Sequence, residues 1–234
     1  MFKPKNKNEL RELIKTVKDL NTIDTSLITN MSWLFYDEKS FNQPLNDWDA
    51  SNVTDMNWMF CDAKSFNQPL NNWDVSNVTD MNYMFNSATS FNHPLNNWDV
   101  SSVDNTRGMF CNARSFNQPL NGWDVSNVED MWGMFNNATS FNQSLNDWNV
   151  SSVSNMVSMF ENAIKYTYSM SNWKLCKNCH CDDFLKNCVM WCRFNDEDDM
   201  PLKGGRRLKS GKGLKGGKRL EIPTYLKRLW ELDV

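Results

Sequence analysis

The chain of 234 residues is 40% apolar and 23% charged, with a formal net charge of −3. These proportions are typical of a folded protein and exclude a chain that is disordered throughout. No apolar run is long enough to cross a bilayer, and the N-terminal residues lack the pattern of a secretory signal. We therefore expect no transmembrane segment, and an intracellular protein rather than a secreted one.

The first predicted element is a capping helix within residues 1–20. Apolar side chains recur at helical spacing from Asn8 to Leu20 and fall on one face. They are Leu10, Leu13, Ile14 and Val17. A helix of this kind is expected to cover the exposed end of the repeats that follow it.

Residues 21–175 repeat with a period of 25 residues. A unit this small cannot bury its own apolar face, so neighbouring units must stack to form one continuous core. Four apolar columns keep the period, and we predict that they form this core. They are Trp48, Trp73, Trp98, Trp123, Trp148 and Trp173; Phe35, Phe60, Phe85, Phe110, Phe135 and Phe160; Phe41, Phe66, Phe91, Phe116 and Phe141; and Leu45, Leu70, Leu95, Leu120 and Leu145.

Each unit reads as a strand, a turn and a short helix. Residues 70–75 alternate apolar and polar side chains, as a half-buried strand does, and Ser76-Asn77 is typical of a turn. Thr79 is a suitable N-cap for a helix with one apolar face. The spacing of residues 70–75 is that of a leucine-rich-repeat strand with Trp in place of one Leu. We predict an α/β repeat solenoid, leucine-rich-repeat-like, with parallel strands on one face, short helices on the other and helical end caps.

Asparagine also recurs in two columns at the predicted turns, and we interpret it as a structural ladder. Stacked Asn side chains can bond main-chain groups that have no ladder partner. The residues are Asn21, Asn46, Asn71, Asn96, Asn121 and Asn146, and Asn42, Asn67, Asn92, Asn117 and Asn142.

The repeat from Phe66 to Met81, Phe-Asn-Gln-Pro-Leu-Asn-Asn-Trp-Asp-Val-Ser-Asn-Val-Thr-Asp-Met, resembles that of BspA-type leucine-rich-repeat surface proteins. Similar repeats occur in the tandem-repeat lipoproteins of mycoplasmas and in large DNA viruses. The resemblance implies a leucine-rich-repeat-like solenoid with an adhesive or protein-binding role and no catalytic residues. The sequence departs from the surface members because it shows no signal peptide, lipoprotein cysteine or wall anchor. An intracellular or virion-associated protein is therefore favoured.

An acidic column follows the strand positions and is the first candidate binding surface. On a strand, these side chains point away from the Trp and Val side chains, toward the predicted concave side. The residues are Asp24, Asp49, Asp74, Asp99 and Asp124. The column is interpreted either as a strip that binds a basic partner or cations, or as a local feature in which each Asp accepts a hydrogen bond within its own turn. If it binds a partner, changing Asp74 and Asp99 to Asn should weaken the complex, and the binding should be salt-sensitive.

An aromatic stripe on the predicted convex side is the second candidate. Trp33, Trp58 and Tyr83 occupy one repeat position, which holds Gly or Ser in later units. Exposed aromatic patches often mark contacts, and large rings are common interface anchors. The alternative is that the rings only shield the helix backbone.

Residues 176–200 form a predicted Cys-rich C-terminal cap. Cys176, Cys179, Cys188 and Cys192 come in two close pairs that are able to supply four thiolate ligands to a structural zinc ion. Buried thiols that seal the last repeat, or disulfides, are the alternatives. No other cofactor is expected.

Residues 201–234 form a predicted basic tail rich in Gly and Lys, with a short helix at its end. This tail holds ten Lys and Arg against three acidic residues, so it carries +7 and residues 1–200 carry −10. Nucleic acid could bind through residues 203–228, because clustered Lys and Arg bind phosphates without reading sequence. A solvated tail, or one that folds back on the acidic body, is the alternative.

The motifs expected of an enzyme are missing from the sequence. His93 and His180 are the two histidines, and no Ser-His-Asp set, Gly-rich phosphate loop or His-Glu zinc motif is present. We predict a non-catalytic protein-interaction or adhesion scaffold with an unidentified protein partner. The alternative is a protein that associates with nucleic acid or an anionic surface through its basic tail.

Overall fold

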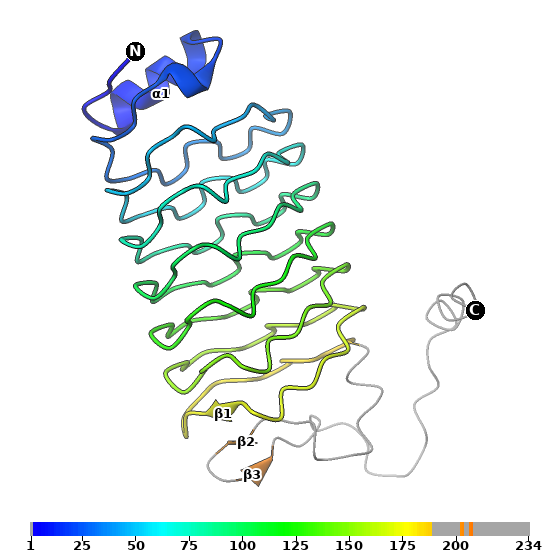
Figure 1. Cartoon of the computed structure of the whole chain (residues 1–234). Coiled ribbons are helices and arrows are strands. Elements are labelled where there is room, and N and C mark those ends of the chain that lie inside the picture. The colour runs from blue at the N-terminus through cyan, green and yellow to red at the C-terminus, as the bar shows by residue number, and fades with distance from the viewer. Residues whose placement is uncertain (1, 189–201, 204–205, 208–234) are drawn as a thin grey trace.

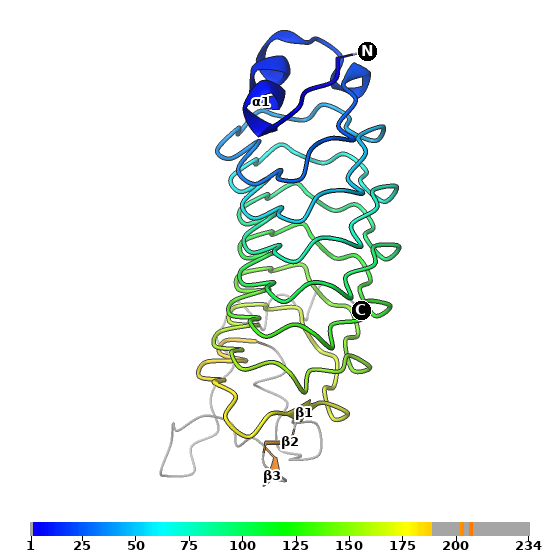
Figure 2. The ribbon, with the colours of Figure 1, turned by 90° about the vertical axis from the view of Figure 1, so that its left-hand side faces the viewer.

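The computed structural model describes residues 2–188, 202–203 and 206–207 (Figure 1). The chain winds in successive coils that lie side by side, with the N-terminal helix at one end of the stack and strand β1 (Lys174–Leu175) at the other (Figures 1 and 2). Parallel β-bridges join residues that are 25 positions apart, so each coil corresponds to one sequence unit. The bridged residues are Asn30, Asp55, Asp80, Asn105, Asp130, Asn155 and His180.

Helix α1 (Lys7–Thr16) covers the N-terminal end of the stack (Figure 1). The side chain of its N-cap, Asn6, accepts hydrogen bonds from the main-chain N–H groups of Asn8 and Glu9. Leu10 is fully buried, and Leu13 and Ile14 pack against the core. The 3-10 helix η1 (Leu20–Thr22) then leads into the first coil.

One segment of each coil carries the main-chain hydrogen bonds that join it to the next coil. The N–H groups of Met56, Trp58, Phe60 and Asp62 donate to the carbonyls of residues 80, 82, 84 and 86 over 2.8–3.0 Å. The alternate N–H groups turn inward to carbonyls three residues earlier, as from Cys61 to Trp58 at 3.2 Å. The same pattern recurs in the other coils, so the main chain of this segment is satisfied without a regular strand or helix.

The predicted repeat helices differ from the structure. Between residues 23 and 188 the described backbone contains no α-helix, and the segment expected to be helical runs through turns. Two positions of each unit have positive φ, as at Trp58 (57°) and Asp62 (59°), and a right-handed helix cannot pass through either. The second position holds Asp, Ser or Asn, of which Asp and Asn tolerate this conformation best. It is occupied by Asp37, Asp62, Ser87, Asn112, Asn137, Asn162 and Asn187.

In most coils the predicted strand position is not a regular strand, although β1 (Lys174–Leu175) occupies it in the unit that ends at residue 175. Residues 70–73 form a turn closed by the Trp73 N–H, which donates to the Leu70 carbonyl at 3.1 Å. Parallel bridging occurs instead in the column of Asp55 and Asp80. Alternation of apolar and polar residues therefore correctly indicated which side chains are buried, whereas most of the pairing between coils lies in another segment.

The predicted aromatic core is confirmed. The six Trp side chains of the repeat column are at most 4% exposed, and the Phe column beginning at Phe35 is at most 1% exposed. Phe rings of neighbouring coils are stacked, with Phe85 and Phe110 having centroids 5.6 Å apart. Each buried indole also donates from Nε1 to a Leu carbonyl of the preceding coil, as Trp98 does to Leu70 at 3.0 Å. The Trp column therefore satisfies a main-chain acceptor as well as filling the core.

The asparagine ladder is confirmed for the column that begins at Asn42. The Asn42 side-chain oxygen accepts from the main-chain N–H of Asn67 at 2.8 Å, and Asn67 accepts in the same way from Asn92 at 3.0 Å. The side chain of Gln68 adds a second bond to Asn42 at 3.1 Å. The other column is less regular, and the buried side-chain oxygen of Asn46 has no partner among the described residues.

The C-terminal end of the described chain extends the stack beyond residue 175. The N–H groups of Met156 and Phe160 donate to the carbonyls of His180 and Phe184, so residues 176–188 add one more coil. Strand β1 (Lys174–Leu175) pairs in parallel with β2 (Leu202–Lys203), which pairs antiparallel with β3 (Arg206–Arg207). The beginning of the basic segment is therefore attached to the last coils, while most of the predicted tail and its terminal helix lie outside the described residues.

Among the described residues, no helix is both long and apolar enough to cross a membrane.

Candidate functional site

Trp33, Tyr36, Trp58 and Tyr83 form a cluster of contacting rings at the surface of the first three coils, which we call the aromatic ridge. The indoles of Trp33 and Trp58 lie 4.8 Å apart at an interplanar angle of 6°, and Tyr83 lies 4.4 Å from Trp58. Tyr36 lies 4.8 Å from Trp33. Trp33 and Tyr36 are 38% and 43% exposed. The ring contacts bring together the three predicted residues of the aromatic stripe and add Tyr36 as a fourth.

The backbone at the ridge is strained. Trp33, Trp58 and Tyr83 have φ of 61°, 57° and 52°, in the left-handed region that bulky L-residues rarely adopt. This conformation costs roughly 1–2 kcal/mol for each residue other than glycine. Gly108 and Gly133 hold the same position with φ of 58° and without that cost. The repeat therefore tolerates glycine here, and the three rings are not required by the turn.

An arginine and a further aromatic residue continue the ridge past its third ring. The Arg107 Nε donates to the Tyr83 hydroxyl at 3.2 Å, and the guanidinium carbon lies 4.5 Å from the centre of the Trp132 ring. The Asp130 carboxylate is 3.6 Å from Nη1 of the same side chain. The Tyr83 ring also covers Gly108, where a Cβ atom would lie 2.6 Å from Tyr83 Cδ1. A glycine at this position therefore allows the Tyr83 ring to approach the main chain of the next coil closely.

The predicted acidic column is present as a row of turn-stabilising carboxylates. The Asp74 carboxylate accepts from the main-chain N–H of Ser76 at 3.0 Å and from its hydroxyl at 2.7 Å. Each of the five carboxylates accepts the main-chain N–H of the Ser two residues later. Asn149 makes both bonds with Ser151 at 3.2 and 2.8 Å, so the turn needs an acceptor rather than a charge. The local hydrogen-bonding interpretation of the column is therefore confirmed.

The carboxylates of Asp24, Asp74, Asp99 and Asp124 are also held in their charged form. Hydrogen bonds from the following Ser side chain and main chain lower the pKa of Asp74, Asp99 and Asp124 below the usual value of 3.8. At Asp24, the hydrogen bond from Lys3, 2.8 Å away, and those from Ser26 lower the pKa to about 2. The four carboxylates from Asp49 to Asp124 belong to exposed residues, so they offer negative charge to solvent as well as closing their turns.

Acid should weaken the folded state through this column. A carboxylate whose folded pKa is lowered contributes stability above its unfolded pKa, and this contribution is lost as the pH falls through the folded pKa. We compare wild type with a variant that carries Asp74→Asn, Asp99→Asn and Asp124→Asn. Between about pH 5 and about pH 2.5, the free energy of unfolding should fall less in the variant than in wild type. Urea unfolding at both pH values measures the difference. Equal losses would show that the lowered pKa values do not stabilise the fold.

Three of the four predicted zinc-binding cysteines are described, and Cys192 lies outside the described residues. The Cys176 thiol donates to the Val153 carbonyl at 3.2 Å, and the buried Cys188 thiol donates to the Tyr166 carbonyl at 3.4 Å. Cys179 is also buried. Among the described residues, no three His, Cys, Asp or Glu side chains are grouped closely enough to hold a metal ion. These thiol contacts are compatible with the buried-thiol alternative, and the zinc site remains a prediction.

The metal content of the protein separates the two alternatives. We expect reduced protein, purified without added metal or chelator, to contain much less than about one zinc per chain by elemental analysis. About one zinc per chain, lost on changing Cys176 to Ser, would instead establish the zinc site.

Sequence reasoning missed Tyr36, Arg107 and Trp132. The available signal was a departure from the repeat, since Arg107 and Trp132 stand in a column that otherwise holds Ser32, Asn57, Asn82 and Val157. The contacts of Tyr36 with Trp33, and of Arg107 with Tyr83 and Trp132, depend on the left-handed turns, and the prediction had placed helices there instead.

The stacked coils define a repeat protein with an aromatic ridge that runs across its first three coils. The family described as "Mycoplasma protein of unknown function, DUF285" matches residues 5–123 and 94–195. The chain belongs to this family. The two matches overlap along the repeats, as expected for tandem units. No curated protein matches the chain, and no solved structure matches it.

Proposed function

We propose that this chain is a non-catalytic interaction scaffold, a leucine-rich-repeat-like solenoid of the BspA type, in which the aromatic ridge contacts a protein partner. Its membership of a repeat family of unknown function is compatible with this role. The stacked units supply a rigid support, and the ridge supplies large rings on three neighbouring coils. Such rings are frequent anchors of protein interfaces.

The observation that carries this proposal is the conformation of the three ridge residues. Trp33, Trp58 and Tyr83 adopt left-handed φ values at positions where Gly108 and Gly133 fit without strain. Bulky residues that are retained against a conformational cost are better evidence of selection for contact than residues that a turn requires. The acidic column is the weaker candidate, because the Ser hydrogen bonds explain its recurrence.

Affinity capture with the full chain as bait tests the proposal. The ridge variant changes Trp58 and Tyr83 to Ser, which Ser158 shows to be accepted at this position. The column variant changes Asp74 and Asp99 to Asn, which Asn149 shows to be accepted in that turn. We expect a protein captured by wild type and by the column variant to be lost from the ridge variant. If the column variant instead loses a salt-sensitive partner that the ridge variant keeps, the acidic column is the site.

A second candidate function is association with nucleic acid through the basic segment. The pairing of β2 with β1 supports it, because it anchors the start of that segment to the last coils. Salt-dependent binding of DNA or RNA by the full chain, lost on deleting residues 208–234, would favour this function. Binding that survives the deletion would exclude the tail as its source.

A further inference from the structure

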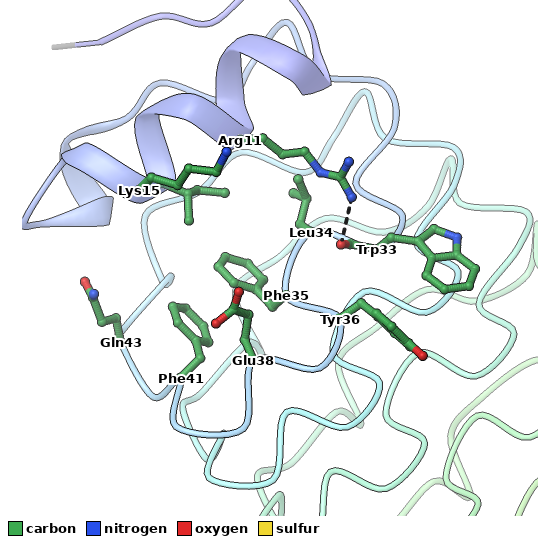
Figure 3. Close-up of a pocket in the computed structure, with 10 residues that line it drawn as sticks. Arg11, Lys15, Trp33, Leu34, Phe35, Tyr36, Glu38, Phe41 and Gln43 are labelled. Carbon is green, nitrogen blue, oxygen red and sulfur yellow. Dashed lines mark hydrogen bonds between the residues drawn. The ribbon is translucent and has the colours of Figure 1, made fainter.

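A groove of about 460 Å³ lies between α1 and the first coil, at the N-terminal end of the aromatic ridge (Figure 3). Ile14 of the helix and Leu34, Phe35 and Phe41 of the coil line its apolar part. The volume is within the range of about 300–1,000 Å³ that is usual for small-molecule sites. The groove arises because α1 covers the end of the stack less completely than another coil would, so that Phe41 is only partly buried while Phe66 is fully buried.

Trp33 and Tyr36 form an open aromatic corner beside this groove. Their rings meet at 57°, and one face of Trp33 is stacked on Trp58. Within the described chain neither the Trp33 Nε1–H nor the Tyr36 hydroxyl has a hydrogen-bond partner. The six buried repeat indoles all donate to a carbonyl, as Trp48 does to Leu20 at 2.9 Å. The corner therefore offers apolar ring surface together with unused polar groups.

The polar rim of the groove mixes both signs of charge. Arg11 and Lys15 lie on the helix side, and Glu38 and Gln43 lie on the coil side (Figure 3). Arg11 donates to the Trp33 carbonyl at 3.2 Å, and this bond fixes the guanidinium beside the aromatic corner. These groups comprise cationic donors, an anionic acceptor and an amide that is both donor and acceptor.

Glu38 is specific to this end of the molecule. Five later coils hold a fully buried alanine at the same position, namely Ala63, Ala88, Ala113, Ala138 and Ala163. Glu38 is exposed and lines the groove. The repeat itself accepts alanine here, so the carboxylate is a departure from the repeat that coincides with the groove.

We propose that this groove binds a neutral hexose unit of a glycan. The C–H face of a sugar ring packs against the electron-rich face of an aromatic ring, as the Trp33 and Tyr36 corner allows. Its hydroxyls both donate and accept, so they pair with Glu38 on one side and with Arg11 and Lys15 on the other. A neutral ligand with several hydroxyls can pair with all three charged side chains, and the polar rim disfavours a purely apolar ligand.

The binding test uses the full chain and the methyl glycosides of glucose, galactose, mannose and N-acetylglucosamine, each probed singly by saturation-transfer NMR. We expect at least one of them to bind saturably. Glu38→Ala, which five other coils show to be compatible with the fold, should weaken that binding about tenfold, as loss of a charged hydrogen-bonding partner does. Tyr36→Ser should weaken it by a similar factor.

Tyr168→Ser is the matched control, because Tyr168 is 42% exposed against 43% for Tyr36 and does not line the groove. It should bind the sugar as wild type does. The proposal is overturned if none of the four glycosides binds, if Glu38→Ala and Tyr36→Ser bind normally, or if only an acidic peptide competes for the groove. Those outcomes leave the ridge proposal standing, since it is tested at Trp58 and Tyr83.

Discussion

Replacing Trp98 with alanine should lower the free energy of unfolding by about 3–5 kcal/mol, as is usual for deleting a large buried side chain. The Trp98 ring is 2% exposed and stacks against Phe85 and Trp123, with centroids 6.4 and 6.5 Å away. The substitution also removes the Nε1 donor from the Leu70 carbonyl. An unsatisfied buried acceptor adds about 1–3 kcal/mol if no water replaces the bond.

Urea unfolding followed by far-ultraviolet circular dichroism measures this effect. Asn97→Ala is the control, because Asn97 is the exposed neighbour of Trp98 in the chain. We expect its effect to stay within about 0.5 kcal/mol, as for most surface substitutions. Similar losses from the two variants would mean that the Trp column is not the core of the stack.

Gly108→Ala should destabilise the protein by about 2–4 kcal/mol, which combines left-handed strain with overpacking. The new Cβ would lie 2.6 Å from Tyr83 Cδ1 at a position where φ is 58°. Gly133→Ala has the same φ, but its nearest neighbour, Asn136 Cβ, lies at an ordinary 3.6 Å. It should therefore show the strain alone, roughly 1–2 kcal/mol.

A double-mutant cycle isolates the contact with the ring. Adding Tyr83→Ser to Gly108→Ala should recover most of the difference between the two glycine variants, because it removes the ring that the Cβ meets. Chemical denaturation of the four proteins in the cycle gives the coupling energy. A coupling energy near zero would mean that Tyr83 does not lie over Gly108.

The sequence predicted the parts of the fold that depend on burial. A column that recurs every 25 residues must meet its own copies in the neighbouring units, so Trp98 and Phe110 could be assigned to the core from spacing alone. The Asn42 ladder followed from the same argument, since stacked turns place identical side chains within hydrogen-bonding reach of the next main chain. None of these predictions needed the local conformation of the unit.

The local conformation was less predictable because the same apolar spacing suits both a helix and a folded turn. Met81, Met84 and Phe85 are buried, as a helical face would be, but the positive φ of Tyr83 and Ser87 excludes a helix. The recurring Asp, Asn, Ser and Gly at these two positions was the available signal. In the first three units an aromatic residue occupies the position of Tyr83 and obscures this signal, since Trp and Tyr are not expected in left-handed turns.

The candidate site was predictable only in part, because departures from the repeat mark residues but not their contacts. Trp33, Trp58 and Tyr83 departed from the repeat and were singled out on that ground. The contacts of Tyr36 and Arg107 with them depend on how the turns direct each side chain, which the sequence pattern does not specify. The structural role of Asp74 was one of two alternatives, and the hydrogen bonds of Ser76 decided it.

The stability of Trp58→Gly tests most directly whether the aromatic ridge serves contact rather than folding. Glycine relieves the left-handed strain at a φ of 57° while removing the contacts of the Trp58 ring with Trp33 and Tyr83. These effects oppose one another, at roughly 1–2 kcal/mol for the strain and about 0.5–1.5 kcal/mol for each aromatic pair. We predict that the unfolding free energy in urea changes by less than about 2 kcal/mol, well below the effect at Trp98. A loss of about 3–5 kcal/mol, equal to that of a core tryptophan, would contradict the account and make the ridge part of the core.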